Sequence, residues 1–274
     1  KRYFEDKGFK NAEVEIKQRE DVTGNNKVLV DININKQSRI KVNKIYLTGV
    51  DKKLEGKAKR AMKKTREKSL RNFLRSKRFL PEKYEEDKGL LIDKLNAWGY
   101  RDALLLTDSV VQVDESHVDI YLNLYQGQKY YLRNISWVGN TVYDSEHLNY
   151  TLKMQKGDVY DQEQLQNRLQ VDEDAIGNLY YNNGYVFNNI DPVEINIVED
   201  SVDLEMRIIE GPQATLNRIR ITGNDRVFEN VIRRELRTKP GDLFSMESIK
   251  RSLRDLSAMN QFDSEILQTE LFKN

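Results

Sequence analysis

The side chains best suited to metal binding are few and widely separated in this chain. It has two histidines, His117 and His147, and no cysteine. A structural or catalytic metal site needs three or four ligands at short spacing, and no set of Asp, Glu or His surrounds either histidine in that way. His117 is predicted to begin a strand and His147 to lie on a helix. The sequence therefore predicts no metal site and no cofactor.

Motifs for covalent or phosphate chemistry are also missing from the sequence. No serine lies in a Gly-x-Ser-x-Gly elbow, and no glycine-rich loop precedes a helix as phosphate binding requires. Carboxylates are abundant, but they are spread through predicted turns and helix faces, without the pair that general acid–base catalysis needs. The chain is predicted not to be an enzyme.

One segment has an unusual local charge. Residues 57–78 contain eleven lysines and arginines and a single acid, Glu67. One interpretation is a solvated helix face and loop; the other is a contact surface for anionic lipid headgroups or an acidic partner. The residues predicted to form this basic surface are Lys63, Lys64, Arg71 and Arg75. Nucleic acid is disfavoured because the whole chain, with 45 basic and 44 acidic residues, has a net charge of only +1.

The composition favours several small domains. Of the 274 residues, 32% are charged and 38% are hydrophobic, which is a high ratio of surface to core for one large domain. No apolar run approaches the ~18 residues of a membrane-spanning helix. The N-terminal residues do not form a signal peptide, so either a signal was removed or the chain begins inside a longer protein, and the internal repeats favour the second interpretation.

Internal repeats organise the sequence. A strand-like segment ending in glycine occurs three times, and its glycines are 90 and 84 residues apart: these segments are 45–49, 135–140 and 219–224. A glycine–aromatic pair closes a helical stretch at Gly8-Phe9, Gly99-Tyr100 and Gly184-Tyr185. A third marker is shared by residues 156–160 and 240–244. Three markers in the same order indicate copies of one module.

Each copy is predicted to have the element order β-α-α-β-β. In the third copy, 131–138 is a strand and about 144–154 a short helix. A long helix follows from Asp161 and stops at Gly184, because glycine tolerates the left-handed conformation of a helix end. Apolar residues then alternate with polar ones in two segments, which indicates an antiparallel hairpin with one buried face.

The predicted domains follow these copies. They are 1–39, the C-terminal part of a unit; 40–128, a unit with a basic insertion over Lys68–Tyr84 and a shorter long helix; 129–213, a whole unit; and 214–274, the opening strand and helices of a unit. The predicted fold class is α+β, a tandem array in which each unit has a three-stranded sheet with two helices on one face.

The pattern resembles the POTRA (polypeptide-transport-associated) domain, and the chain resembles the periplasmic arm of the BamA family of outer-membrane assembly proteins. The residues that carry the resemblance are the Gly-Asn pairs at Gly139 and Gly223, the Gly-Asp-aromatic turns at Gly157 and Gly241, the glycine–aromatic helix ends, and the strand endings at 125–127 and 209–212.

The resemblance implies a periplasmic portion of a bacterial outer-membrane protein, attached to a membrane β-barrel. It implies a scaffold that receives unfolded outer-membrane β-barrel proteins and docks accessory assembly lipoproteins. Two alternatives are the POTRA region of a two-partner secretion or autotransporter-assembly transporter, and a passive structural spacer.

Receipt of clients is expected to use β-augmentation, in which an extended segment pairs with an exposed sheet edge. The last strand of each hairpin is predicted to lie in mid-sheet, so the strand before it lies on the edge. Pro192 blunts that edge in the third copy, because proline cannot donate to a ladder. In the second copy the edge has no proline. The predicted client-binding residues there are Leu106, Thr107, Asp108, Ser109, Val110 and Val111.

Overall fold

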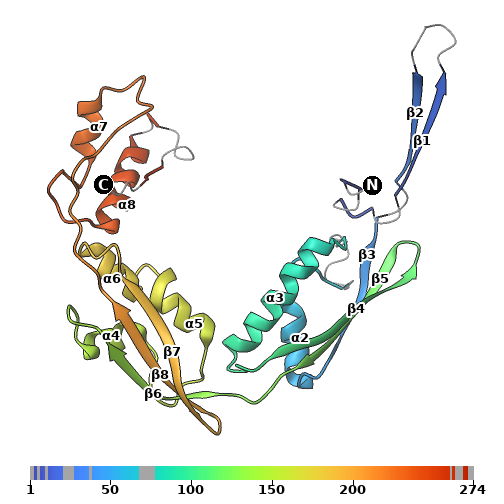
Figure 1. The fold of residues 1–274 in the computed structure, drawn as a ribbon, viewed down its shortest axis with the longest axis horizontal. Coiled ribbons are helices and arrows are strands. Elements are labelled where there is room, and N and C mark those ends of the chain that lie inside the picture. The colour runs from blue at the N-terminus through green and yellow to red at the C-terminus, as the bar shows by residue number, and fades with distance from the viewer. Residues whose placement is uncertain are drawn as a thin grey trace. The chain divides into compact units, whose positions relative to one another are not determined.

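The computed structural model describes residues 3–4, 7–9, 12–20, 28–36, 39–67, 78–259, 261–262 and 268–270. Its contacts divide the chain into two compact units (Figure 1). Unit 1 comprises residues 1–130 and 159–163, and unit 2 comprises residues 131–158 and 164–274. Each unit contains a three-stranded sheet with helices, so the predicted α+β fold class is confirmed.

Unit 1 contains a hairpin and a three-stranded sheet. In chain order its elements are β1 (Glu13–Glu20), β2 (Val28–Asn35), β3 (Lys41–Thr48), α2 (Lys52–Ala61), α3 (Pro81–Ala97), β4 (Leu104–Asp114) and β5 (His117–Tyr125). β1 and β2 pair antiparallel, and the larger sheet has the order β3-β5-β4. In that sheet β5 is parallel to β3 and antiparallel to β4.

The core of unit 1 lies between this sheet and its two helices. Alternate residues of β5, from Val118 to Leu124, are buried, because a strand directs every second side chain to the same face. Met62 follows α2, Leu91 and Leu95 lie on α3, and all three are buried in the same cluster. Both helices therefore cover one face of the sheet (Figure 1).

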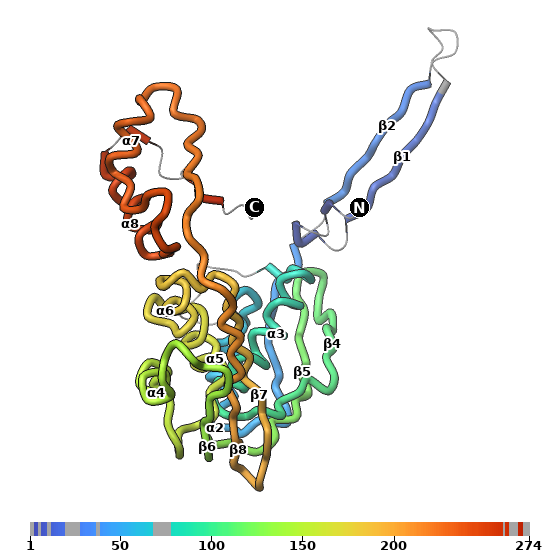
Figure 2. The backbone as a smooth tube through the Cα atoms, turned by 60° about the vertical axis from the view of Figure 1, so that its left-hand side comes forward, coloured from blue at the N-terminus to red at the C-terminus, as the bar shows by residue number. Residues whose placement is uncertain are grey.

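The sheet of unit 2 repeats this topology. The elements from residue 131 onward are β6 (Tyr131–Val138), α4 (Ser145–Leu152), α5 (Gln162–Gln166), the π-helical turn η2 (Asn167–Val171), α6 (Ile176–Asn182), β7 (Asn189–Val198), β8 (Ser201–Ile209), α7 (Glu229–Glu235) and α8 (Met246–Ala258). The order β6-β8-β7 places the last strand in the middle, parallel to β6 and antiparallel to β7 (Figure 2). The prediction that the final hairpin strand lies in mid-sheet is confirmed in both sheets.

The prediction of one long helix from Asp161 to Gly184 is wrong. The segment is divided into α5, η2 and α6, and residues 172–175 are not helical. The Arg168 side chain is the physical cause: it is buried, and its guanidinium donates to the Thr151 carbonyl, to Asp172 and to Asp174. A buried guanidinium must have its donors satisfied, and the non-helical residues 172–175 supply two of the acceptors, Asp172 and Asp174.

Two further predictions need correction. Tyr84 belongs to α3 and not to an insertion, and α3, with 17 residues, is the longest unbroken helix of the described residues. The opening strand predicted near Ile219 is also absent: between residues 214 and 259 the only β pairing is an isolated bridge from Thr215 to Leu243. An extended segment becomes a strand only when it is paired, and the described residues offer this one no ladder.

A repeated pair of backbone hydrogen bonds joins successive copies of the module inside each unit. In unit 2 the Ala214 N–H donates to the Gly184 carbonyl at 2.8 Å, and the Phe244 N–H donates to the Ala214 carbonyl at 3.0 Å. In unit 1 the Ile40 N–H donates to Gly8 at 3.1 Å, and the Phe79 N–H donates to Ile40 at 2.9 Å. The glycine–aromatic marker therefore provides the acceptor that fixes the start of the next copy.

Candidate strand-binding edge

All six residues of the predicted client-binding segment lie on β4. β4 is an outer strand of the β3-β5-β4 sheet, so within the described residues one of its sides has no neighbouring strand. Its exposed apolar side chains include Leu104, Leu106, Val111 and Val113, each with 47% or more of its surface accessible. The strand has 11 residues and contains no proline.

Alternate residues of β4 direct their backbone groups to β5. The carbonyl of Ser116, directly before β5, accepts from the Lys41 N–H, and the Leu122 carbonyl within β5 accepts from the Thr48 hydroxyl. The even-numbered residues of β5 therefore direct their backbone groups to β3. Odd-numbered residues such as Tyr121 therefore face β4, and Tyr121 is the partner of Ser109. Since successive residues of a strand alternate in direction, Ser109 bonds inward while Asp108 and Val110 direct their N–H and C=O groups to the open side.

The Asp108 side chain is committed to α3. Its carboxylate accepts hydrogen bonds from the Tyr84 hydroxyl at 2.8 Å and from Lys88 Nζ at 3.2 Å, and Lys88 also lies 5.0 Å from the Tyr84 ring. Burial and then the hydrogen bond to Asp108 raise the pKa of Tyr84. Burial opposes the charge of Lys88, but hydrogen bonds to Glu85 and Asp108 outweigh it and raise its pKa. No local sequence pattern indicates this group of three side chains, which fixes β4 against α3 and leaves only the Asp108 backbone for pairing.

Two of the other outer strands, β3 and β7, are less accessible. On β3, the Lys41 position forms a bridge with Arg78, and the Ile45 N–H donates to the carboxylate of Glu67 at 3.1 Å. On β7, Pro192 lies opposite Met206 of β8. The Tyr131 N–H of β6 donates to the carbonyl of Asp200, directly before β8, so the even-numbered residues of β8, including Met206, direct their backbone groups to β6. The missing N–H of Pro192 therefore belongs to the open side, and it interrupts the row of donors there.

The predicted basic surface is only partly within the described residues. Arg71 and Arg75 lie outside them. Lys63 and Lys64 follow α2 and are exposed, and Lys64 Nζ forms an ion pair with Glu86. The Lys64 N–H donates to the buried carboxylate of Asp87 at 2.9 Å, which holds this loop against α3.

The histidines take the predicted elements but form no metal centre with their neighbours. His117 begins β5, and its Nδ1 lies 2.9 Å from Asp114 in the β4–β5 turn. Hydrogen bonds from the Ser116 N–H and then from His117 lower the pKa of Asp114. The described residues contain no cluster of three or more His, Asp or Glu that could hold a metal ion. None of the helices in this part of the chain is long and apolar enough to cross a membrane.

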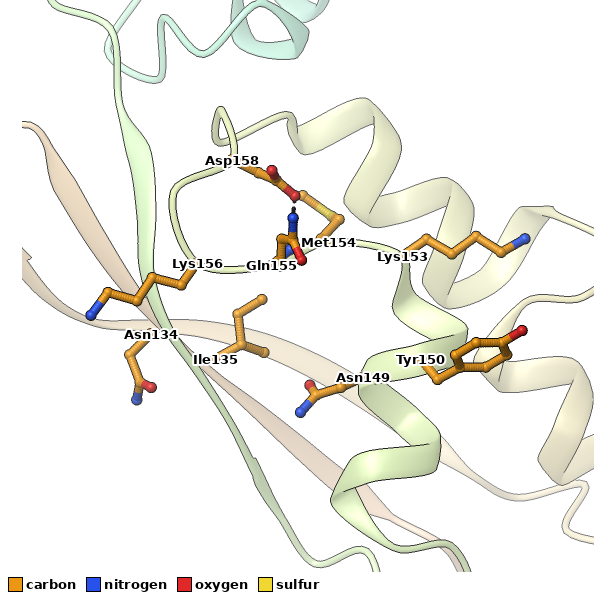
Figure 3. Close-up of a pocket in the computed structure, with 9 residues that line it drawn as sticks. All are labelled: Asn134, Ile135, Asn149, Tyr150, Lys153, Met154, Gln155, Lys156 and Asp158. Atoms are coloured by element: carbon orange, nitrogen blue, oxygen red, sulfur yellow. Dashed lines mark hydrogen bonds between the residues drawn. The ribbon is translucent and has the colours of Figure 1, made fainter.

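A cavity beside β6 was not predicted from the sequence. It has a volume of about 640 Å³ and lies between the outer side of β6, the C-terminal end of α4 and the turn at 155–158 (Figure 3). Its lining residues come from two segments, 134–135 and 149–158, which are brought together by the packing of α4 on the sheet, so no local pattern could have indicated it.

The chain belongs to the POTRA family. The family model described as "Surface antigen variable number repeat" matches residues 130–211 and 214–271, which together are about half of the chain. The sheet order, and the placement of helices between the first strand and the hairpin in both three-stranded sheets, agree with this assignment.

Relatives of known name are outer-membrane assembly factors. The "Putative outer membrane protein assembly factor" of Treponema pallidum is 24% identical over 96% of this chain and 31% of its own length. The "Outer membrane protein assembly factor BamA" of Neisseria meningitidis serogroup B is 26% identical over 87% of this chain and 30% of its own. The chain thus spans about a third of the length of these relatives.

Among solved structures, the fold is similar to "Haemophilus Influenzae BamA POTRA3-5". The TM-score is 0.64 at 17% sequence identity, and the match covers 82% of this chain and 87% of that one. At this sequence identity the similarity establishes a shared fold.

Proposed function

We propose that this chain is the POTRA region of a BamA-like outer-membrane protein assembly factor, located in the bacterial periplasm. In this proposal β4 receives extended segments of unfolded outer-membrane β-barrel proteins by β-augmentation. Accessory assembly lipoproteins are further proposed partners, and an attached membrane β-barrel would receive the clients. The names of the relatives support the class of protein.

The open side of β4 is the observation that carries the proposed mechanism. Within the described residues, no atom outside the β4–β5 ladder forms a hydrogen bond with the backbone of Asp108 or Val110. Main-chain pairing along such an edge is largely independent of the client's side chains, which suits a receiver of many sequences.

Proline at Val110 should weaken client binding without unfolding the sheet. The substitution removes an N–H that faces the open side, so an incoming strand loses a ladder bond and meets the proline ring. We expect crosslinking of a urea-denatured β-barrel protein to fall at least about fivefold, since one lost backbone hydrogen bond costs about 1 kcal/mol or more. The crosslinker is placed at the exposed position Val113.

Two variants control for the proline. Val110→Ala removes the same side chain but keeps the N–H, and it should leave crosslinking close to that of the parent protein. Ser109→Pro removes an N–H bonded to β5 and should destabilise the sheet by about 3 kcal/mol. Equal unfolding by both prolines, or unchanged crosslinking in the Val110→Ala and Val110→Pro proteins alike, would show that clients do not pair with this edge.

The same experiment separates this proposal from its alternatives. A passive spacer would give no specific crosslink from Val113. A two-partner secretion or autotransporter-assembly transporter would crosslink its own passenger in preference to an unrelated β-barrel protein.

The basic surface is proposed to contact anionic lipid headgroups. Reversing the charges of Lys63 and Lys64, together with Arg71 and Arg75, should reduce binding to phosphatidylglycerol vesicles. The parent protein's binding should fall steeply with salt, because screening shortens the reach of exposed charges. A cosedimentation assay that finds no binding at low salt, or equal binding by parent and variant, would leave only a solvated surface.

A further inference from the structure

Three copies of the module have an isoleucine at the equivalent place in their first extended segment: Ile45 on β3, Ile135 on β6, and Ile219. The groups that surround this isoleucine differ between the copies. Ile45 pairs with Ile120, and Ile135 pairs with Leu204, at matching places in two sheets of the same topology. The buried helix residues Ala58 and Leu148 are separated by the same 90 residues as the two isoleucines, so α2 and α4 are also in register.

In the copy that contains β3, a carboxylate from the same chain lies beside the outward N–H of this isoleucine. Glu67 Oε2 accepts from the Ile45 N–H at 3.1 Å, and Lys59 Nζ lies 3.8 Å from that oxygen. An outward-facing strand N–H and a neighbouring cation thus bind one carboxylate.

In the copy that begins at 214, the position is also covered by a side chain. Arg233 Nη2 donates to the Ile219 carbonyl at 2.9 Å. Arg233 follows the buried residue Ile232 on α7, as Lys59 follows Ala58 on α2. The helix residue beside the strand is therefore cationic in both of these copies.

In the β6 copy, the corresponding place is the cavity of about 640 Å³ (Figure 3). The helix position holds Asn149, whose Oδ1 accepts from Trp137 Nε1 at 2.8 Å. Within residues 78–259, no side chain forms a hydrogen bond with the Ile135 backbone. The edge that the other two copies cover with their own side chains is open here.

The charges around the cavity favour a single anion. Lys156 lies on the Asn134 side of the cavity and forms no direct ion pair within residues 78–259, although its charge contributes to the lowered pKa of Asp203 (Figure 3). Asp158, which also lines the cavity, accepts from the Gln155 N–H at 2.8 Å, and Lys153 is directed away to Asp174. Nearby, Arg133 is paired with Asp203. A lysine and an outward strand N–H thus line the same cavity, as Lys59 and the Ile45 N–H flank the carboxylate of Glu67.

We propose that the cavity beside β6 binds an acidic side chain of a partner polypeptide, with its carboxylate at the position that Glu67 occupies beside β3. A carboxylate is favoured over a phosphate because Lys156 is the one lining lysine that is not directed to another carboxylate, and one cation matches the single charge of a carboxylate better than the roughly −1.5 to −2 charge of a phosphate group. The proposed site is on a different sheet and a different strand from the client-binding edge, so it does not depend on the function proposed above.

A short capped peptide with a central glutamate, and its glutamine twin, test the proposal. Each is titrated into the ¹⁵N-labelled full chain, and the amide shifts of Ile135 and Lys156 are followed. We expect saturable shifts with the glutamate peptide and an affinity at least about tenfold higher than for the twin, as for a charge-assisted hydrogen bond.

Matched variants locate the interaction. Lys156→Gln should weaken the glutamate peptide several-fold, while Lys153→Gln, whose amine is directed away from the cavity, should change its affinity less than about twofold. Asn149→Lys, which introduces the counterpart of Lys59, should strengthen binding. The amide spectra show that each variant remains folded.

Three outcomes would overturn the proposal. They are equal binding of the two peptides, shifts that map away from Ile135, and equal effects of the two glutamine substitutions. Shifts of Ile135 with phosphatidylglycerol bicelles but not with the glutamate peptide would assign the cavity to a lipid phosphate instead.

Discussion

Replacing Gly139 by alanine should destabilise the β6-β8-β7 sheet by about 3 kcal/mol or more. Gly139 ends β6 with φ of 88°, and a Cβ built there would lie 2.1 Å from the Ile208 carbonyl oxygen. The left-handed backbone costs about 1–2 kcal/mol for an L-residue, and relief of the clash by moving the middle strand adds about 1–3 kcal/mol. The loss can be measured by urea unfolding, followed by Trp137 fluorescence in a Trp98→Phe background.

Gly223 provides a matched control. Its φ is 78°, but no atom lies within 4 Å of a Cβ built at this position. Gly223→Ala should therefore cost only the backbone term, about 1–2 kcal/mol. Equal losses in the two variants would mean that the contact with β8 contributes nothing, and that the glycine marker reflects local backbone conformation alone.

Replacing Arg168 by methionine should lower the unfolding free energy of unit 2 by about 2–4 kcal/mol. Arg168 is only 6% exposed, and its loss leaves the Thr151 carbonyl without the guanidinium that donates to it at 3.0 Å. Breaking a buried charge network has a cost of this size, because the remaining polar groups lose their partners. Arg207→Met, which removes an exposed arginine paired with Glu205, should cost less than about 1 kcal/mol.

The pH dependence of stability tests the same network. The pKa of Asp174 is lowered, chiefly by the hydrogen bond from Arg168 and then by that from Lys153. Because the folded pKa lies below the unfolded value of about 3.9, this stabilisation is fully present above about pH 4 and is lost as the pH falls toward the folded pKa. In urea titrations between neutral and acidic pH, the parent protein should lose stability more steeply than Arg168→Met. Parallel curves would contradict the assigned ion pair.

Several features of the fold could be predicted from the sequence, because they depend on local conformation. Alternation of apolar and polar residues in 118–124 and 202–208 marked strands with one buried face, and both became the middle strands β5 and β8. The marker glycines at 49, 139 and 223 all have positive φ. Pro192 indicated an outer strand, since a middle strand would need its missing N–H. These rules concern a residue and its near neighbours, so the sequence contains them directly.

The features that only the tertiary structure decided depend on partners distant in the chain. The helix predicted from Asp161 is broken because Arg168 reaches back to Thr151, 17 residues earlier. Asp108, counted with the client-binding edge, has its side chain bound by Tyr84 and Lys88 of α3.

The state of each sheet edge was decided in the same way. Glu67 covers the β3 edge from 22 residues away, whereas the corresponding edge of β6 borders a cavity. The sequence by itself determined the two hairpins β4–β5 and β7–β8 and which face of each is buried, because period and backbone preference are local. It did not determine which edges remain open, because a hydrogen bond between distant residues depends on where packing places both of them.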